Sequence, residues 1–443
     1  MVTTHGVPRP HGVPILHSAP IVVPVTGEPI ADGAVLVDGD RVAEVGPRAE
    51  LAGRHPTAEQ HAWTGVLTPG LVNAHAHTQY SDFEELNSLG EPFAVWIARM
   101  AAKRATFTRQ MWQRSAQRGL ELMLAAGTTA VADIVTDPEV LEPSARSGLA
   151  GISYLEAVFL DARAWAGGGR DRFAAALDAA PAGRTVGVSP HTPYTLATAV
   201  FVDCVAVARD RGLRIHTHVA ESAAEVEYVA TGTGPFRDFM SNAGMAMELI
   251  RDGGCGLSPV GYLDKMGALG PDVHAAHCVH CDGQDRETLR SRGVAVALCV
   301  RSNRILQSGE PPVAAYLDEG SPFGIGTDSL ASSPSLDLLE EAAALRALAR
   351  DQGYRHDDLD RRIFEAATLG GAAAMGLADV GRIEPGARAD LAVFELPGLA
   401  AAGSDAHGPL EAGPIYAALL DAAADRAHRC VATVLGGAIV HRA

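Results

Sequence analysis

Short apolar runs recur along the middle of the chain, and stretches with helical periodicity separate them. Eight runs are short enough to be strands, at residues 67–77, 128–135, 150–159, 185–189, 213–218, 273–277, 294–299 and 323–327. Regular alternation of strand and helix is typical of an α/β fold with a parallel sheet, and eight such units make a (β/α)8 TIM barrel. The pattern therefore predicts a barrel of this kind.

Both ends of the chain show a different pattern, in which β-like runs alternate with turns. Near the N-terminus two apolar runs flank Asp38-Gly39-Asp40, which is a hairpin signal, and similar runs stand at 391–394 and 431–440. Neither end has enough apolar residues to bury its strands alone. We expect one small β-sandwich domain built from residues 1–66 and 379–443, with the barrel over residues 67–378.

Polar residues stand at the C-terminal ends of four predicted strands, where a barrel places its catalytic groups. The first strand ends in His75 and His77, and because side chains on a strand repeat every two residues, both imidazoles point the same way. The other three strands contribute His216, His218 and Glu221 (fifth), His277 (sixth) and Asp328 (eighth).

This collection of side chains indicates metal-dependent hydrolysis. Three imidazoles and one carboxylate suit a divalent ion such as zinc, with one further position for water. Such an ion lowers the pKa of water from ~15.7 to about 7, so that water becomes a nucleophile at neutral pH. Glu221 is placed to move a proton, His277 to fix the attacking water, and Asp328 to serve both the metal and a proton.

Other histidines and cysteines have structural interpretations. The spacing from Cys278 to Cys281 resembles half of a zinc knuckle, but no second ligand pair follows it, so we expect Cys278 in the core. His216 fits an interior barrel histidine better than a ligand. His280 fits the surroundings of the site or the surface.

Two further features have both a functional and a structural interpretation. The Gly-rich segment 231–258 is either a lid over the site or an insertion with a small apolar plug. Phe83, Phe93 and Trp96 either line a pocket for a planar base or pack between helices.

Composition and charge narrow the partners. The chain of 443 residues is 47% hydrophobic and 20% charged, which suits a large globular core. Its net charge of −17 argues against binding to nucleic acid or an anionic membrane. No apolar run approaches the ~18–20 residues of a membrane span. Six scattered cysteines and a Pro-rich start without a signal-peptide pattern favour the reducing cytoplasm.

Several of these segments resemble the amidohydrolase superfamily, in particular its branch of mononuclear-metal deaminases and chlorohydrolases. The matching segments are residues 69–77, 189–194, 216–221, 276–280, 326–328 and 381–391. The resemblance implies that His75, His77, His218 and Asp328 bind one metal ion, zinc or alternatively iron. No lysine stands at a strand end, since Lys103 and Lys265 are the only two, which favours one metal over two.

The resemblance also implies catalytic roles. Glu221 would protonate a ring nitrogen of the substrate, His277 would orient the attacking water-derived nucleophile, and Asp328 would act with them. His191 would contact the substrate. The habit of the family further suggests a homodimer that acts on a small aminopurine nucleoside.

The substrate preference rests on residues 299–303 and 326–332, which are similar to those of aminodeoxyfutalosine deaminases of menaquinone biosynthesis, although Val300 replaces the usual proline. Arg301 and Ser332 are the predicted substrate contacts here, because a guanidinium pairs well with a carboxylate. Arg99, Arg104 and Arg304 are further candidate partners. Deamination of S-adenosylhomocysteine, methylthioadenosine, adenosine or guanine, or hydrolysis of a C–Cl or cyclic amidine bond, remain the alternatives.

Overall fold

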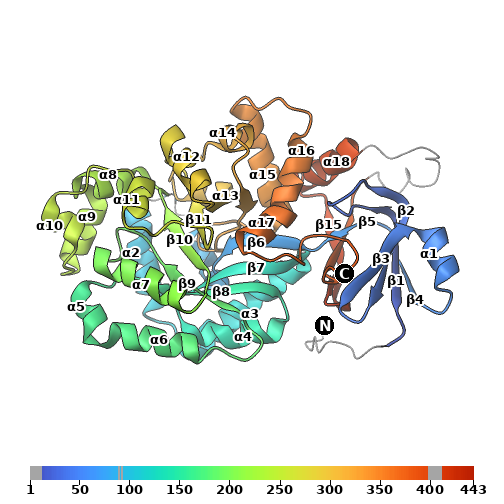
Figure 1. Ribbon diagram of the computed structural model, residues 1–443, viewed down its shortest axis with the longest axis horizontal. Helices are drawn as coiled ribbons and strands as arrows, with labels where there is room; N and C mark the ends of the chain where they lie inside the picture. Colours follow the sequence, from blue (N-terminus) through green and yellow to red (C-terminus); the bar gives the residue numbers. More distant parts are fainter. Residues whose placement is uncertain (1–11, 88–89, 91–92, 398–411) are drawn as a thin grey trace.

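The computed structural model describes residues 12–87, 90, 93–397 and 412–443. Eight parallel strands form the predicted barrel (Figure 1): β6 (Leu71–Ala76), β7 (Thr128–Val135), β8 (Ala150–Ala157), β9 (Val186–Pro190), β10 (Ile215–Val219), β11 (Val273–His277), β12 (Ala295–Leu298) and β13 (Phe323–Ile325). Neighbouring strands pair in chain order. A parallel bridge from Ala76 to Asp328 joins the first strand to the last and nearly closes the barrel.

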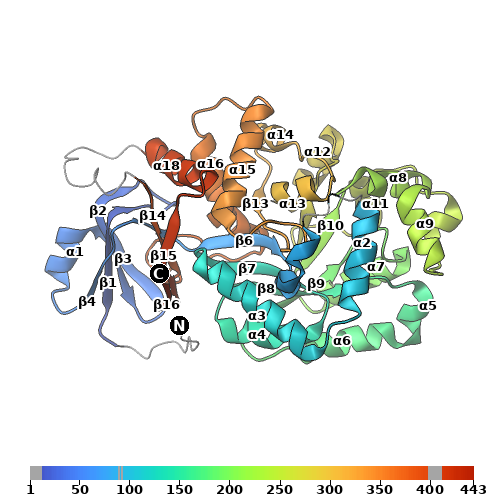
Figure 2. The ribbon, with the colours of Figure 1, turned by 180° about the vertical axis from the view of Figure 1, so that it is seen from behind.

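Helices cover the outside of the barrel (Figures 1 and 2). The helices of the described chain are α2 (Phe93–Arg104), α3 (Arg109–Ala125), α4 (Leu141–Ser147), α5 (Ala162–Ala164), α6 (Arg170–Asp178), α7 (Thr198–Asp210), α8 (Ala223–Thr231), α9 (Gly234–Asn242), α10 (Glu248–Asp252), α11 (Pro259–Lys265), α12 (Gly283–Ser291), α13 (Val300–Ile305), α14 (Val313–Asp318), α15 (Leu338–Asp351), α16 (Leu359–Glu365), α17 (Gly371–Ala374) and α18 (Ala412–Ala424). The 3-10 segments η1 (Thr78–Leu86) and η2 (Pro138–Val140) and the π-helical segments η3 (Trp165–Gly169) and η4 (Ala366–Gly370) lie between them. None of these described helices combines the length and apolar character that a membrane span requires.

The strands of both termini form a second sheet, as predicted. From the N-terminal side come β1 (Ile15–Val22), β2 (Ile30–Asp38), β3 (Arg41–Pro47), β4 (Glu59–Ala62) and β5 (Val66–Pro69), with α1 (Arg48–Arg54); from the C-terminal side come β14 (Leu391–Glu395), β15 (Arg429–Leu435) and β16 (Ala438–Arg442). Strand β5 pairs with β1 on one side and β14 on the other, so it joins the two halves into one sheet. Both halves contribute to one apolar core.

The chain passes from this sheet into the barrel at Gly70. The sequence reads as one apolar run, but β5 belongs to the small sheet and β6 to the barrel. A Cβ at Gly70 would lie 2.0 Å from the Thr129 hydroxyl oxygen, so only glycine fits where the two sheets approach each other. This crossing directs β6, and the two histidines at its end, into the barrel.

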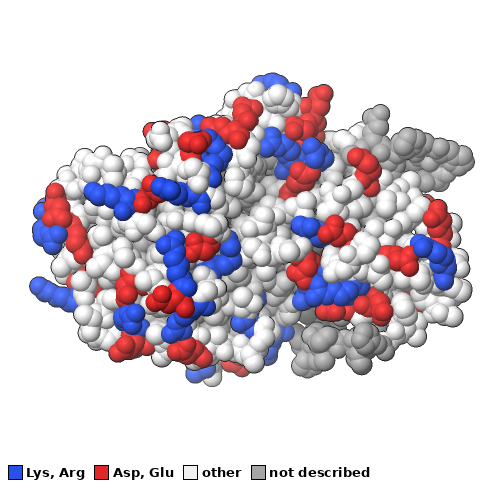
Figure 3. Space-filling view, viewed as in Figure 1, with Lys and Arg blue, Asp and Glu red and all other residues white. Residues whose placement is uncertain are grey.

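The segment 231–258 forms α9 and α10, which lie at one end of the barrel (Figure 1). Phe236 is buried and stacks on Tyr194 with ring centroids 3.9 Å apart. The segment therefore packs, through Phe236, against Tyr194 in the loop that follows β9. On the face shown in Figure 3, acidic and basic side chains are interspersed in small groups.

Candidate metal centre and substrate cavity

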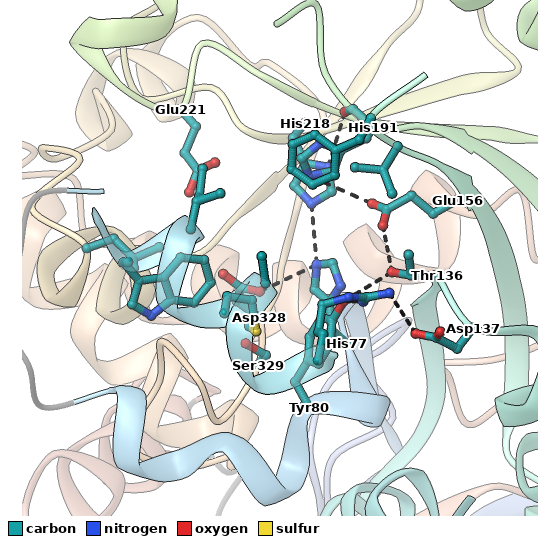
Figure 4. Close-up of a pocket in the computed structure, with 18 of the residues that line it drawn as sticks. His77, Tyr80, Thr136, Asp137, Glu156, His191, His218, Glu221, Asp328 and Ser329 are labelled. Carbon is teal, nitrogen blue, oxygen red and sulfur yellow. Dashed lines mark hydrogen bonds and ion pairs between the residues drawn. The ribbon is translucent and has the colours of Figure 1, made fainter. Parts of the chain in front are cut away.

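Four side chains predicted as metal ligands, His75, His77, His218 and Asp328, meet at the C-terminal end of the barrel. Figure 4 shows His77, His218 and Asp328 of this set. Asp328 Oδ1 lies 3.7 Å from the Nε2 atoms of both His75 and His77. The Nε2 atoms of His77 and His218 are 3.3 Å apart. Ligand atoms of His75, His77 and His218 all lie within 4.8 Å of one another. The distances between these groups allow a single cation to contact all four.

A chain of hydrogen bonds fixes which nitrogen of His75 carries its proton. The His274 carbonyl only accepts, so His216 Nδ1, 3.0 Å away, must donate to it. The Nε2 atom of neutral His216 is then an acceptor, and it lies 2.8 Å from His75 Nδ1. His75 Nδ1 therefore donates, and His75 Nε2 keeps a lone pair. Among the described residues that buried Nε2 has no hydrogen-bond partner, which fits a metal ligand.

His218 has the same tautomer for the same reason. Its Nδ1 lies 3.3 Å from the His191 carbonyl oxygen and donates to it, so the lone pair is on Nε2, facing His77. Burial lowers the pKa of His218 well below 6.5, which keeps the ring neutral. Neutral imidazoles with inward lone pairs beside a carboxylate are a donor set that zinc prefers.

Two serines hold the carboxylate of Asp328. The hydroxyls of Ser302 and Ser332 donate to Oδ2 at 2.6 and 3.0 Å, which leaves Oδ1 directed at His75 and His77. Among the described residues, Ser332 does not line the cavity. The hydroxyl of Ser332 orients Asp328, and its contact with a substrate stays a prediction.

His277 and Glu221 form a pair beside this cluster. Asn303 Nδ2 donates to His277 Nδ1 at 3.0 Å, so the proton of the neutral ring is on Nε2, which lies 3.7 Å from Glu221 Oε1. Burial raises the pKa of Glu221 well above 4.5, with help from the charges of Asp328 and Glu225. Burial thus favours the protonated acid, which can donate a proton to a substrate.

Glu225 shapes the turn that presents Glu221. Its carboxylate accepts the backbone N–H groups of Ala220 and Glu221, each at 2.9 Å, and it is fully buried. Ala220 has φ +51°, a conformation that needs such support. Sequence reasoning missed Glu225, and it named Asn303 only within the segment 299–303, without its contact to His277. Only the spacing of Glu225, one helical turn beyond Glu221, hinted at its role.

A cavity of about 410 Å³ opens from the histidine cluster. One wall is largely apolar and comes mainly from α2, with Trp96, Ile97 and Met100; Phe159 and Leu306 also line the cavity. Trp96 thus lines a pocket as one interpretation expected, whereas Phe83 is buried against Trp112, and the Phe93 side chain lies outside the described residues. The polar lining consists of His77, Tyr80, Arg104, Thr136, Asp137, Glu156, His191, His218, Glu221, His277, Asp328 and Ser329 (Figure 4).

Arg301 lies behind the site and not in the described cavity lining. Its Nε donates to Glu341 Oε2 and its Nη1 to Glu340 Oε2, both at 2.6 Å, and its side chain is buried. Two carboxylates on α15 hold this guanidinium in an internal ion pair, and its contact with a substrate carboxylate stays a prediction. Arg304 pairs with Glu310 at 2.9 Å.

Known proteins are similar to this chain in sequence and in fold. The sequence pattern of the Amidohydrolase family matches residues 66–434, and that of a bacterial imidazolonepropionase-like composite domain matches residues 33–58. A 5-methylthioadenosine/S-adenosylhomocysteine deaminase from Pelotomaculum thermopropionicum is 31% identical over 388 residues, covering 82% of this chain and 80% of the relative. An aminodeoxyfutalosine deaminase from Deinococcus radiodurans is 32% identical over 359 residues, covering 78% and 81%.

The fold has solved counterparts. A crystal structure of an adenosine deaminase from Xanthomonas campestris with bound zinc superposes with a TM-score of 0.77 at 24% identity, covering 97% of this chain and 93% of the other. At this identity the likeness shows a shared fold.

Proposed function

The chain belongs to the amidohydrolase family, and from that premise we propose that it is a metal-dependent deaminase that releases ammonia from the 6-amino group of an adenine nucleoside. The family makes it a hydrolase that acts on C–N bonds. The observation that carries the proposal is the Glu221–His277 pair, 3.7 Å apart, beside three neutral histidines and a carboxylate at the end of a partly aromatic cavity. An acid of this kind is what protonation of a purine ring requires.

The proposed metal site consists of His75, His77, His218 and Asp328. Bound there, a divalent ion would supply a Lewis acid that lowers the pKa of water from ~15.7 to about 7. The inward lone pairs and the serine-held carboxylate fit zinc, and iron accepts the same ligands. Side chains of the protein would transfer the protons and position the substrate.

Two side chains, Asp328 and Glu221, would move the protons, and His277 would orient the water oxygen. Asp328 Oδ1 takes one proton from water as the water oxygen bonds to purine C6, and protonated Glu221 gives its proton to N1. The Nε2–H group of His277 hydrogen-bonds the incoming oxygen. Glu221 then recovers the proton of that oxygen as the C6=O bond forms, while Asp328 gives its proton to the amino group, so the C6–N bond breaks and ammonia leaves.

His191 would bind the far edge of the purine. Its ring borders the cavity, and its Nδ1 is hydrogen-bonded to Thr195 Oγ1 at 2.8 Å, which holds the other ring edge toward the cavity. A purine whose N1 meets Glu221 would present its N3 side to this histidine.

We propose two candidate substrates, which differ in the group attached to the adenine nucleoside. Aminodeoxyfutalosine, an intermediate of menaquinone biosynthesis, is supported by residues 299–303 and 326–332 and by the Deinococcus relative. A 5′-thio nucleoside such as methylthioadenosine or S-adenosylhomocysteine is supported by other relatives and by the apolar wall of α2. The ion pairing of Arg301 removes one argument for a carboxylated substrate.

A substrate panel tests both the deamination reaction and the choice of substrate. Zinc-loaded protein is incubated with aminodeoxyfutalosine, methylthioadenosine, S-adenosylhomocysteine, adenosine and guanine, and ammonia is measured, with chloride release from a chlorinated triazine as a counter-assay. We expect ammonia from at least one adenine nucleoside at a kcat/KM near 10⁴ M⁻¹s⁻¹ or above. Chloride release without ammonia from any nucleoside would reject deamination, and the ranking within the panel assigns the substrate.

A further inference from the structure

We infer that Glu156, at the end of β8, recognises the hydroxyl groups of the substrate sugar, an inference that rests on the proposed function. The side chain of Glu156 is 4% exposed and borders the cavity. Its Oε2 accepts a hydrogen bond from Thr136 Oγ1 at 2.7 Å. Its Oε1 is buried and has no hydrogen-bond partner within the described residues.

An unpaired acceptor in this position needs a donor. Leaving a buried polar group unsatisfied costs about 1–3 kcal/mol, and such groups in folded proteins nearly always have a partner. The nearest candidate is His191 Nε2, but it lies 3.8 Å from Oε1, too far for a hydrogen bond. A hydroxyl group of a bound ligand would supply the missing donor.

The place of Glu156 matches the sugar end of a nucleoside. Glu221 and Glu156 lie on opposite sides of the His77–His218 pair (Figure 4). If purine N1 faces Glu221, then the opposite edge of the ring, with N3 and the sugar attached at N9, faces His191 and Glu156. The sugar 2′-hydroxyl lies on the N3 side of a nucleoside, so it is the group nearest to Glu156.

The neighbours of Glu156 make this wall rich in acceptors. Asp137 also borders the cavity, and its carboxylate holds Arg104 Nη2 at 2.9 Å, while Arg104 Nη1 contacts the Tyr80 hydroxyl. The guanidinium is thus already paired with a carboxylate. Two carboxylates and the hydroxyls of Tyr80 and Thr136 suit a neutral polyol such as ribose, whose hydroxyls donate.

Discrimination between sugars tests the inference. The zinc-loaded wild type and Glu156→Ala are assayed with adenosine, 2′-deoxyadenosine and 3′-deoxyadenosine, and the ratio of kcat/KM between ribose and deoxyribose substrates is compared. We expect the wild type to prefer adenosine over one deoxy substrate by about 10²-fold or more, because a site built to bond a hydroxyl rejects the analogue without it. In Glu156→Ala that ratio should fall toward one.

Two further variants separate sugar recognition by Glu156 from a purely structural role. Glu156→Gln keeps the shape and an acceptor oxygen, and should retain part of the preference. Glu142→Gln, an exposed change on α4, should leave the ratio as in the wild type. Binding of inosine against 2′-deoxyinosine, followed by the fluorescence of Trp96 and Trp112 in the cavity wall, gives the same comparison without turnover.

The outcomes distinguish the two proposals. If adenosine is deaminated but the wild type shows no preference, or if Glu156→Ala keeps the full preference in turnover and binding, then Glu156 does not recognise the sugar and deamination still holds. If the wild type deaminates no nucleoside at all, the proposed function fails and this inference with it.

Discussion

His216 should control the metal affinity of His75, although it is not itself a ligand. Its Nε2 accepts the proton of His75 Nδ1 at 2.8 Å, and its ring stacks on His274 with centroids 3.6 Å apart. The change His216→Phe keeps an aromatic ring in that stack and removes the acceptor. His75 must then either leave Nδ1–H buried and unpaired or move its proton to Nε2, where it blocks the lone pair.

The structure sets the size of the expected effect. An unsatisfied buried donor costs about 1–3 kcal/mol, and loss of a hydrogen bond that supports a metal ligand typically weakens binding by about 10–100-fold. At about 1.4 kcal/mol for each factor of ten, the two ranges agree. We therefore expect the zinc Kd of His216→Phe to rise by roughly 10–100-fold. His216→Gln, whose amide oxygen can still accept, should recover most of that loss.

The assay is a zinc titration in competition with a chromogenic chelator, with the unfolding midpoint of the metal-free protein measured alongside. His17→Phe is the matched control, because His17 is a fully buried histidine of the small sheet, bonded to Trp63 and remote from the site. It should change stability and leave the zinc Kd unchanged. The reasoning is refuted if His216→Phe binds zinc within about twofold of wild type, or if His17→Phe weakens binding equally.

Three further predictions follow from the site and its surroundings. Glu221→Gln should lower kcat by about 10²–10⁴-fold while the zinc content measured by atomic absorption stays the same, and an unchanged kcat would contradict its role as the acid. Removing zinc with a chelator should abolish ammonia release and lower the unfolding midpoint, with both restored by added zinc, since the ion binds only the folded state. Burial lowers the pKa of His428, but the 2.9 Å hydrogen bond to Asp337 raises it, and the net result is a pKa above 6.5. The protonated ring therefore stabilises the fold below pH 6.5, and this contribution is lost as the pH rises through the folded pKa. His428→Gln should therefore cost about 1.5–3 kcal/mol in chemical unfolding at pH 6 and little at pH 9; an equal loss at both values would rule out the ion pair.

The apolar pattern was enough to predict the barrel and the convergence of its strand ends. Strands alternate their side chains, so the spacing of His75 and His77 placed both rings on one side, and their centroids are 5.0 Å apart. Barrel topology then brings His218 and Asp328 to the same end. These relations depend only on the order and period of strands, which a sequence displays.

Contacts between groups far apart in the chain were not predictable in this way. Arg301 looked available for a substrate, but Glu340 and Glu341 on α15 hold it, and their helix reads as ordinary barrel exterior. Asn303 was named only as part of the segment 299–303, and Glu156 belongs to no recognisable motif. Their roles follow from hydrogen bonds to His277 and to Thr136, at 3.0 and 2.7 Å, which the pattern of residue types does not encode.

The two His-x-His motifs show why strand register decides what a motif means. On β6 the second histidine lies just beyond the strand, so His75 and His77 both reach the cluster. On β10, His216 pairs in register with His274, one layer deeper than His218, which pairs with Ala276. The interior of such a barrel is usually filled by apolar side chains. Here a deeper polar layer is kept because each ring nitrogen in it has a partner, and because that layer orients the histidine above it.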